Sequence, residues 1–211
     1  MGLSEKAIVT VNSNGTSGRQ RFSLAHELGH WVYHRGQIMT CKADVIGSFG
    51  DKASAAEKHA DNYAASLLMP RYLYQPALRS YRQLDFDVIR GLSNHFSVSV
   101  TAAARRCVEI GDWPAMLVCH NHKGRYWFFR SQLIPTRWFP RQDLQSESSA
   151  MEMLFGSRMP GQISRLRCVS AEAWFDRYEA QRYEVLEQSF KVSPNEIITL
   201  LVFEDDEMLD D

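Results

Sequence analysis

Two histidines, His26 and His30, stand four positions apart, and Glu27 directly follows the first of them in the segment HELGH. Four positions make about one turn of an α-helix, so a helix here places both imidazole rings on one face. Two ring nitrogens in that arrangement can share one zinc ion, while the glutamate can reach a water molecule beside it. The segment therefore predicts a helix that carries two metal ligands and one general base.

The residues around this segment favour a helix over residues 21–34. Apolar or small residues, among them Phe22 and Ala25, recur at helical spacing. Ser23 is the predicted N-cap, and Gly36 is the predicted end of the helix. The alternative interpretation of the motif is a surface helix whose two histidines bind no metal.

A catalytic zinc ion needs a third protein ligand, which must come from another part of the chain. The longer motif H-E-x-x-H-x-x-G-x-x-H is absent, because Tyr33 and Gly36 stand at its last Gly and His positions. Residues 36–52 contain glycines and show no periodicity, which predicts a loop long enough to reverse the chain. The third ligand is therefore expected on the helix that follows this loop.

That second helix is predicted over residues 53–69, a segment rich in Ala and Leu that ends before Pro70. Glu57 is the leading candidate for the third ligand. Asp61, one turn further on, is expected to accept the free N–H of a ligand histidine. His59 and Asp61 are the competing ligands, and His59 lies about 200° around the helix from Glu57, so those two cannot both face the metal.

Two segments resemble the ImmA/IrrE-type metallopeptidases of bacteria and phages. Residues 19–34 (RQRFSLAHELGHWVYH) are similar to the family's R-x-R-F-T-L-A-H-E-L-G-H-x-x-x-H, and residues 57–70 (EKHADNYAASLLMP) to its E-x-x-A-N-x-F-A-A-x-L-L-M-P. The sequence departs from the second motif at Asp61 and Tyr63, where the family has Asn and Phe. The resemblance covers residues 7–111 and implies a helical, zincin-like metallopeptidase domain with a small sheet.

The resemblance also implies roles for individual residues. His26, His30 and Glu57 would bind the metal, and Glu27 would be the catalytic base. The implied cofactor is Zn²⁺, with Mn²⁺ as the alternative. The implied substrate is a bacterial or phage regulatory protein, a helix-turn-helix repressor that is cut in a stress response or in the life of a mobile element.

Residues 84–96 and 100–110 predict two further helices around the short turn 97–99, a helix-turn-helix-like pattern. Arg105 and Arg106 lie in the second of them, where a DNA-binding protein places its recognition helix. Three alanines precede these arginines, however, and few side chains of this helix can contact base edges. Packing helices are the favoured interpretation, and a DNA-binding regulator is the alternative.

The character of the chain changes after Gly111. A turn at residues 121–124 joins two strand-like runs, and His120 and His122 beside it are expected to lie in solvent. Residues 171–178 fit a helix or a strand, and residues 135–162 predict a long loop. Strands are predicted at 7–11, 115–120, 125–130, 183–190 and 197–203.

The predicted fold class is therefore α+β. Residues 1–111 would form the zincin-like metallopeptidase domain with its helix-turn-helix-like helices. Residues 112–211 would form a β-rich domain with a sensory or partner-binding role.

Composition narrows the class of protein further. With 45% hydrophobic and 23% charged residues and a net charge of -1, the chain is not of the disordered class. No stretch approaches the ~18 consecutive apolar residues of a membrane span, and the N-terminus lacks the regions of a signal peptide. The four cysteines form no C-x-x-C pair, so free thiols in the cytoplasm are expected. The remaining alternative to an enzyme is a non-catalytic sensor in which a metal with four protein ligands stabilises the fold.

Overall fold

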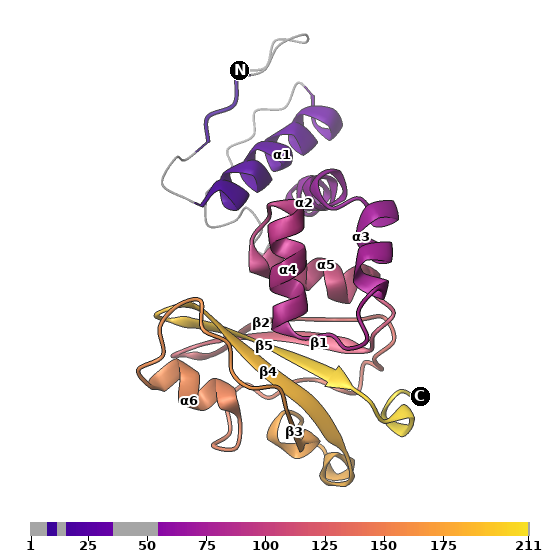
Figure 1. Ribbon diagram of the computed structural model, residues 1–211, viewed down its shortest axis with the longest axis vertical. Coiled ribbons are helices and arrows are strands. Elements are labelled where there is room, and N and C mark those ends of the chain that lie inside the picture. The colour runs from indigo at the N-terminus through magenta and orange to yellow at the C-terminus, as the bar shows by residue number, and fades with distance from the viewer. Residues whose placement is uncertain (1–7, 12–15, 36–54, 211) are drawn as a thin grey trace.

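A computed structural model describes residues 8–11, 16–35 and 55–210, and over these it confirms the α+β class (Figure 1). The first part of the described chain is helical, and the second contains a five-stranded sheet. The helices of the first part are α1 (Ser17–Tyr33), α2 (Ala55–Leu68), α3 (Arg71–Arg79), α4 (Phe86–Phe96) and α5 (Val100–Ile110).

The sheet is antiparallel throughout and has the strand order β2-β1-β5-β4-β3. Its strands are β1 (Ala115–Asn121), β2 (Gly124–Arg130), β3 (Arg167–Ser170), β4 (Glu184–Ser193) and β5 (Glu196–Phe203). The helix α6 (Ser149–Phe155) and the short 3-10 helices η1 (Ala171–Ala173), η2 (Tyr178–Arg182) and η3 (Asp206–Met208) complete this part. Strand β5 is central and buried from Ile197 to Phe203, and Thr199 is the one polar residue of this stretch.

Helices cover both faces of the sheet, as Figure 1 shows. Alternate residues of β5 point to opposite sides: Leu200 packs in one core with residues of α4 and α5, and Leu201 packs in a second core with residues of α6. The first core crosses residue 111, since it joins Ile89 of α4 and Val108 of α5 to the sheet. The division into domains at residues 1–111 and 112–211 stays a prediction.

Helices α1 and α2 pack directly on each other at Gly29. A Cβ atom at this position would lie 3.0 Å from the Cα atom of Ala60, so a larger residue would require the two helices to move apart by a few tenths of an ångström. The N-terminal half of α1 is tied to the end of α4, where the Arg21 guanidinium donates to the carbonyl oxygens of Phe96 and Ser97 at 3.3 and 3.2 Å. This packing places α1 and α2 beside the α4–α5 layer.

The predicted start of the first helix was wrong by four residues. Helix α1 begins at Ser17 with Thr16 as its N-cap, whose side chain accepts from the Arg19 N–H, and Ser23 lies inside the helix. Residues 8–11, part of the predicted strand 7–11, form no strand. Gly36 and the predicted loop 36–52 lie outside the described residues.

Among the α-helices and strands, three short elements were not predicted: α3, α6 and β3. The predicted loop 135–162 was wrong over residues 149–155, which form α6. Pro70 ends the second predicted helix as expected, but it is also the N-cap of α3, which contains Pro76. Tertiary contacts hold these elements: the Tyr74 hydroxyl of α3 donates to the Ala103 carbonyl at 2.7 Å. The carboxylate of Glu187 on β4 accepts from the backbone N–H of Ser149 at the start of α6, 2.6 Å away. Residues 171–178, predicted as a helix or a strand, form η1 and the first residue of η2.

The predicted hairpin between β1 and β2 is present, and its turn contains Gly124 at φ +108°. His122 is exposed as predicted, but the prediction for His120 was wrong because its side chain is only 1% exposed. His120 lies on the face of β1 that packs against the Trp174 ring, 5.8 Å away between ring centroids. Alternate side chains of β1 therefore face the same buried side of the sheet as far as His120, where the sequence predicted exposure to solvent.

Of the cysteines in the described part, Cys107 and Cys119 are buried, Cys168 is exposed, and all three carry free thiols. Cys41 lies outside the described residues. None of the described helices combines the length and the apolar character that a membrane crossing requires.

Candidate metal centre

The spacing of His26 and His30 on α1 places both side chains toward α2. Their Nε2 atoms lie 3.1 Å apart, and the two rings meet edge to face with centroids 4.7 Å apart. Both side chains are buried. Two imidazole nitrogens are therefore directed at the same small volume in the interior.

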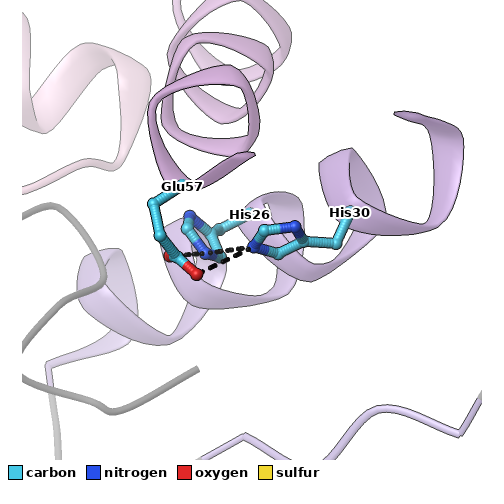
Figure 2. A group of neighbouring side chains, drawn as sticks. All are labelled: His26, His30 and Glu57. Atoms are coloured by element: carbon cyan, nitrogen blue, oxygen red, sulfur yellow. Dashed lines mark hydrogen bonds and ion pairs between the residues drawn. The ribbon is translucent and has the colours of Figure 1, made fainter. Parts of the chain in front are cut away.

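Glu57 enters the same volume from the first turn of α2 (Figure 2). Its Oε2 atom lies 3.2 Å from His26 Nε2, and its Oε1 atom lies 3.6 Å from His30 Nε2. Each of the three residues offers one donor atom, and these atoms lie within 4.8 Å of one another. Over the described residues, this metal group consists of His26, His30 and Glu57.

The donor atoms of the metal group fit a zinc ion. Ligands bound to tetrahedral zinc at about 2.0–2.1 Å lie roughly 3.3–3.4 Å from one another. The three separations between the donor atoms, 3.1, 3.2 and 3.6 Å, lie around this value. Two imidazoles and one carboxylate also form a donor set that catalytic zinc sites use, which leaves a fourth position for water or substrate.

Asp61 fixes the orientation of the His26 ring. Its Oδ1 atom lies 2.8 Å from His26 Nδ1, and the Asp61 side chain is 3% exposed. A carboxylate only accepts hydrogen bonds, so Nδ1 carries the proton and Nε2 keeps its lone pair directed at the metal group. His30 makes a corresponding contact, with its Nδ1 atom 3.2 Å from His34 Nδ1.

The two histidines differ in their electrostatics. Burial lowers the pKa of His26, but the hydrogen bond and charge of Asp61, with the charges of Glu57 and Glu27, raise it above the ordinary value. Burial and the neighbouring His26 lower the pKa of His30 below the ordinary value. The carboxylates therefore surround His26 more closely than His30.

The other sequence-predicted residues lie at different distances from the metal group. Glu27 is half-buried, and its charge acts on the pKa of both His26 and His30. His59 is exposed and lies outside the group, with its ring stacked on His34 at a centroid distance of 6.3 Å. Of the three candidate third ligands, the structure brings Glu57 to the two Nε2 atoms and places Asp61 on the opposite ring nitrogen of His26.

Arg105 and Arg106, the arginines of the helix-turn-helix-like pattern, contact other parts of the protein. The Arg105 guanidinium carbon lies 4.3 Å from the centroid of the Phe129 ring on β2. Arg106 is 7% exposed, and it donates to the Met69 carbonyl at 3.0 Å and to Glu109 at 2.8 Å. The sequence did not indicate the contacts to Phe129 and to Met69, because they join segments that are distant along the chain.

Comparisons with known proteins agree with the helical part of this architecture. The family model described as Peptidase_M78, IrrE N-terminal-like domain, matches residues 2–108. No match is found among curated proteins. Among solved structures, the chain is similar to a Mycobacterium tuberculosis transcriptional regulator, with 14% sequence identity and a TM-score of 0.54.

That structural match covers 90% of this chain, which spans 57% of the length of the other. At such low identity the likeness shows the fold alone. The family match is more informative, because it extends over half of the chain and contains the whole metal group. This chain belongs to the Peptidase_M78 family, as the resemblance of its two motifs predicted.

Proposed function

We propose that the chain is a zinc-dependent metallo-endopeptidase. The observation that carries this proposal is the metal group itself: two buried imidazole nitrogens and one carboxylate converge, and Asp61 orients His26 from behind at 2.8 Å. A structural zinc site would be expected to have four protein ligands, whereas the group found over the described residues has three. Membership of a peptidase family supports the same conclusion.

His26, His30 and Glu57 would hold the ion. A bound Zn²⁺ ion supplies a Lewis acid that lowers the pKa of water and polarises a peptide carbonyl. Glu27 follows His26 in sequence and is half-buried, and its charge raises the pKa of both imidazoles, which supports a role for its carboxylate as the acceptor of the attacking water's proton. Glu27 would then deliver this proton to the leaving amine, as a general acid. Mn²⁺ is the alternative metal for this oxygen- and nitrogen-donor site.

The substrate that we propose is a helix-turn-helix repressor of a bacterium or phage, cleaved in the cytoplasm. This part of the proposal rests on the two motifs that resemble ImmA/IrrE-type peptidases and on the family match. We further propose that residues 112–211 bind a partner or a signal, since their sheet contacts the helical part through a shared core.

A DNA-binding regulator is the competing function, and the similar Mycobacterium tuberculosis protein is described as a transcriptional regulator. The contacts of α5 weigh against DNA recognition by this helix. Arg106 is buried and bonded to Met69 and Glu109, and Arg105 lies over Phe129, so neither side chain is directed outward.

Glu27→Gln separates the peptidase from a metal-stabilised scaffold. The amide keeps the size of the side chain but cannot accept a proton, and general acid–base catalysis typically contributes about 10²–10⁴-fold in rate. We expect the variant to fold and to bind zinc like the wild type while cleavage of a co-expressed repressor encoded beside this protein falls by that factor. Equal function of wild type and Glu27→Gln, with loss of function in His26→Ala, would show that the metal is structural.

A further inference from the structure

We propose that His34 is a positioning residue for the metal centre, whose Nδ1 atom accepts a hydrogen bond from His30 Nδ1 and so keeps His30 Nε2 directed at the metal. This inference rests on the proposed function, because it concerns the same metal group. His34 ends the segment of residues 19–34 that resembles the family motif. It is neither one of the three candidate ligands found over the described residues nor the proposed general base.

The contact between the two imidazoles lies on the side of the His30 ring that faces away from the metal group. His30 Nδ1 is 3.2 Å from His34 Nδ1, whereas His30 Nε2 is 3.1 Å from His26 Nε2. The two nitrogens of an imidazole are distinct, and their in-plane bonds point in widely different directions. A group bonded to His30 Nδ1 therefore does not compete for the metal position at Nε2.

The metal decides which of the two histidines donates. A hydrogen bond between two imidazole nitrogens needs a proton on one of them and a lone pair on the other. A metal on His30 Nε2 uses the lone pair of that nitrogen, so the proton of the neutral ring is on Nδ1. His30 is then the donor, and His34 accepts at Nδ1 and carries its own proton on Nε2. The arrangement matches that of His26, whose Nδ1 lies 2.8 Å from Asp61 Oδ1.

Contacts within α1 and with α2 hold His34 beside His30. His34 is the C-cap of α1, and its backbone N–H donates to the His30 carbonyl at 2.8 Å. Its ring stacks on His59 of α2, with an interplanar angle of 6° and centroids 6.3 Å apart. The preceding residue, Tyr33, meets Tyr63 of α2 edge to face at a centroid distance of 5.8 Å. Side chains of both helices therefore determine where the acceptor nitrogen lies.

His34 and Asp61 should differ in the strength of their effects. Asp61 offers a carboxylate oxygen at 2.8 Å from its histidine, whereas His34 offers an uncharged nitrogen at 3.2 Å. Hydrogen bonds to a charged acceptor are roughly twice as strong as those between neutral groups. Loss of the His34 acceptor should therefore lower the zinc affinity by about tenfold, the lower end of the usual range for an outer partner of a ligand.

The first part of the test measures zinc affinity. The full-length chain competes with a chromophoric chelator for Zn²⁺, and thermal unfolding of the metal-free protein is recorded in parallel. His34→Phe keeps a flat ring for stacking but removes the acceptor, so it should show the full loss of about tenfold. His34→Asn places an amide oxygen close to the position of Nδ1 and should recover most of this loss. His95→Phe, at an exposed position in the last turn of α4, is the matched control and should bind zinc like the wild type.

The second part measures the protons themselves, by NMR of the zinc-loaded wild-type chain with isotope-labelled histidines. We expect the His30 proton on Nδ1 and the His34 proton on Nε2, and faster exchange of the His30 proton with water in His34→Phe. If His34→Phe does not fold, the two tautomers in the wild type decide the inference.

Three results would overturn the inference while the proposed function stands. They are a proton on His34 Nδ1 in the zinc-loaded chain, wild-type zinc affinity of His34→Phe, and equal losses in His34→Phe and His34→Asn. A wild-type chain that takes up no zinc would overturn the proposed function as well. So would zinc bound to a nitrogen of His34, because the site would then have the four protein ligands of a structural zinc.

Discussion

At the scale of single residues, His26 uses its two ring nitrogens differently. Nδ1 lies 2.8 Å from Asp61, and Nε2 faces His30 and Glu57. A carboxylate behind a ligand histidine fixes the tautomer and makes the other nitrogen a better donor to a metal. The residue that follows His26, Glu27, is not one of the three candidate ligands.

Two substitutions of Asp61 should lower the zinc affinity to different extents. Asp61→Ala removes the acceptor for His26 Nδ1, and we expect about 10–100-fold weaker zinc binding. Asp61→Asn keeps an acceptor oxygen, so its effect should be smaller. Zinc competition on both purified variants measures the difference. Complete and equal loss of metal in the two variants would instead identify Asp61 as a ligand.

His120 predicts a pH dependence of stability. Burial lowers its pKa to about 4, the neighbouring Arg125 acts in the same direction, and a backbone contact to Arg141 and the charge of Asp143 act in the opposite direction. Its unfolded-state pKa is about 6.5, so between pH 6.5 and 4 the unfolded chain binds more protons than the folded chain. The free energy of unfolding should therefore decrease as pH falls through this window, by about 3 kcal/mol from this group.

Urea unfolding at several pH values measures this effect of His120. His120→Gln cannot titrate, so the variant should lose less stability than the wild type between pH 6.5 and 4, although it starts from a lower stability. Parallel curves for the two proteins would show that another group causes the acid sensitivity.

At the scale of elements, the approach of α1 to α2 determines the metal group. His26 and His30 come from α1 and Glu57 from α2, so the distance between the two helices sets the distance from the Glu57 carboxylate to the two imidazoles. Gly29 lies between the two histidines, and the added Cβ atom would meet Ala60 Cα at 3.0 Å and Tyr63 Cβ at 3.1 Å. The glycine of the HELGH segment thus has a packing role beside the chemical roles of its neighbours.

Gly29→Ala should separate the helices. Overpacking of this kind typically costs 1–3 kcal/mol, roughly, and the shift should also weaken zinc binding. Gly91→Ala on α4 is the matched control, because its added Cβ would meet only the Tyr81 hydroxyl at 3.7 Å. We expect the control to be neutral or more stable by about 0.5–1 kcal/mol, since alanine favours a helix interior. Unfolding free energies and zinc affinities measure both variants, and equal behaviour of the two would contradict the packing argument.

At the scale of the whole molecule, the helices and the sheet share a hydrophobic core. Leu84, Ile89 and Val108 from the helical part pack with Leu117 and Leu200 from the sheet. Buried side chains of this kind belong to one cooperative unit when neither side can lose them without exposing the other. One hydrophobic cluster therefore contains side chains from both sides of the peptide between α5 and β1.

Metal-free protein should consequently unfold in a single transition. Far-UV circular dichroism reports mainly on the helices. In a Trp31→Phe variant, fluorescence reports on Trp113, Trp127, Trp138 and Trp174, which all follow α5 in the chain. We expect the two signals to change at the same urea concentration, with EDTA present so that metal binding does not stabilise one part. Loss of the helical signal at a clearly lower concentration would favour separate domains at residues 1–111 and 112–211.

The sequence by itself determined the family, the α+β class and the elements with strong local signals. Helix α5 has the predicted bounds because Ser99 caps it and Gly111 follows it. The hairpin forms because its turn ends in a glycine. Spacing on α1 placed His26 and His30 on one face, since that relation depends only on helical geometry.

Tertiary structure alone decided the relations between distant segments. Which of Glu57, His59 and Asp61 approaches the two Nε2 atoms depends on how α2 rotates against α1. The burial of His120 and the formation of α3 and α6 depend on partners far along the chain, such as Trp174, Ala103 and Glu187. Local periodicity reports which face of an element is apolar, but the partner of that face is set by packing between elements.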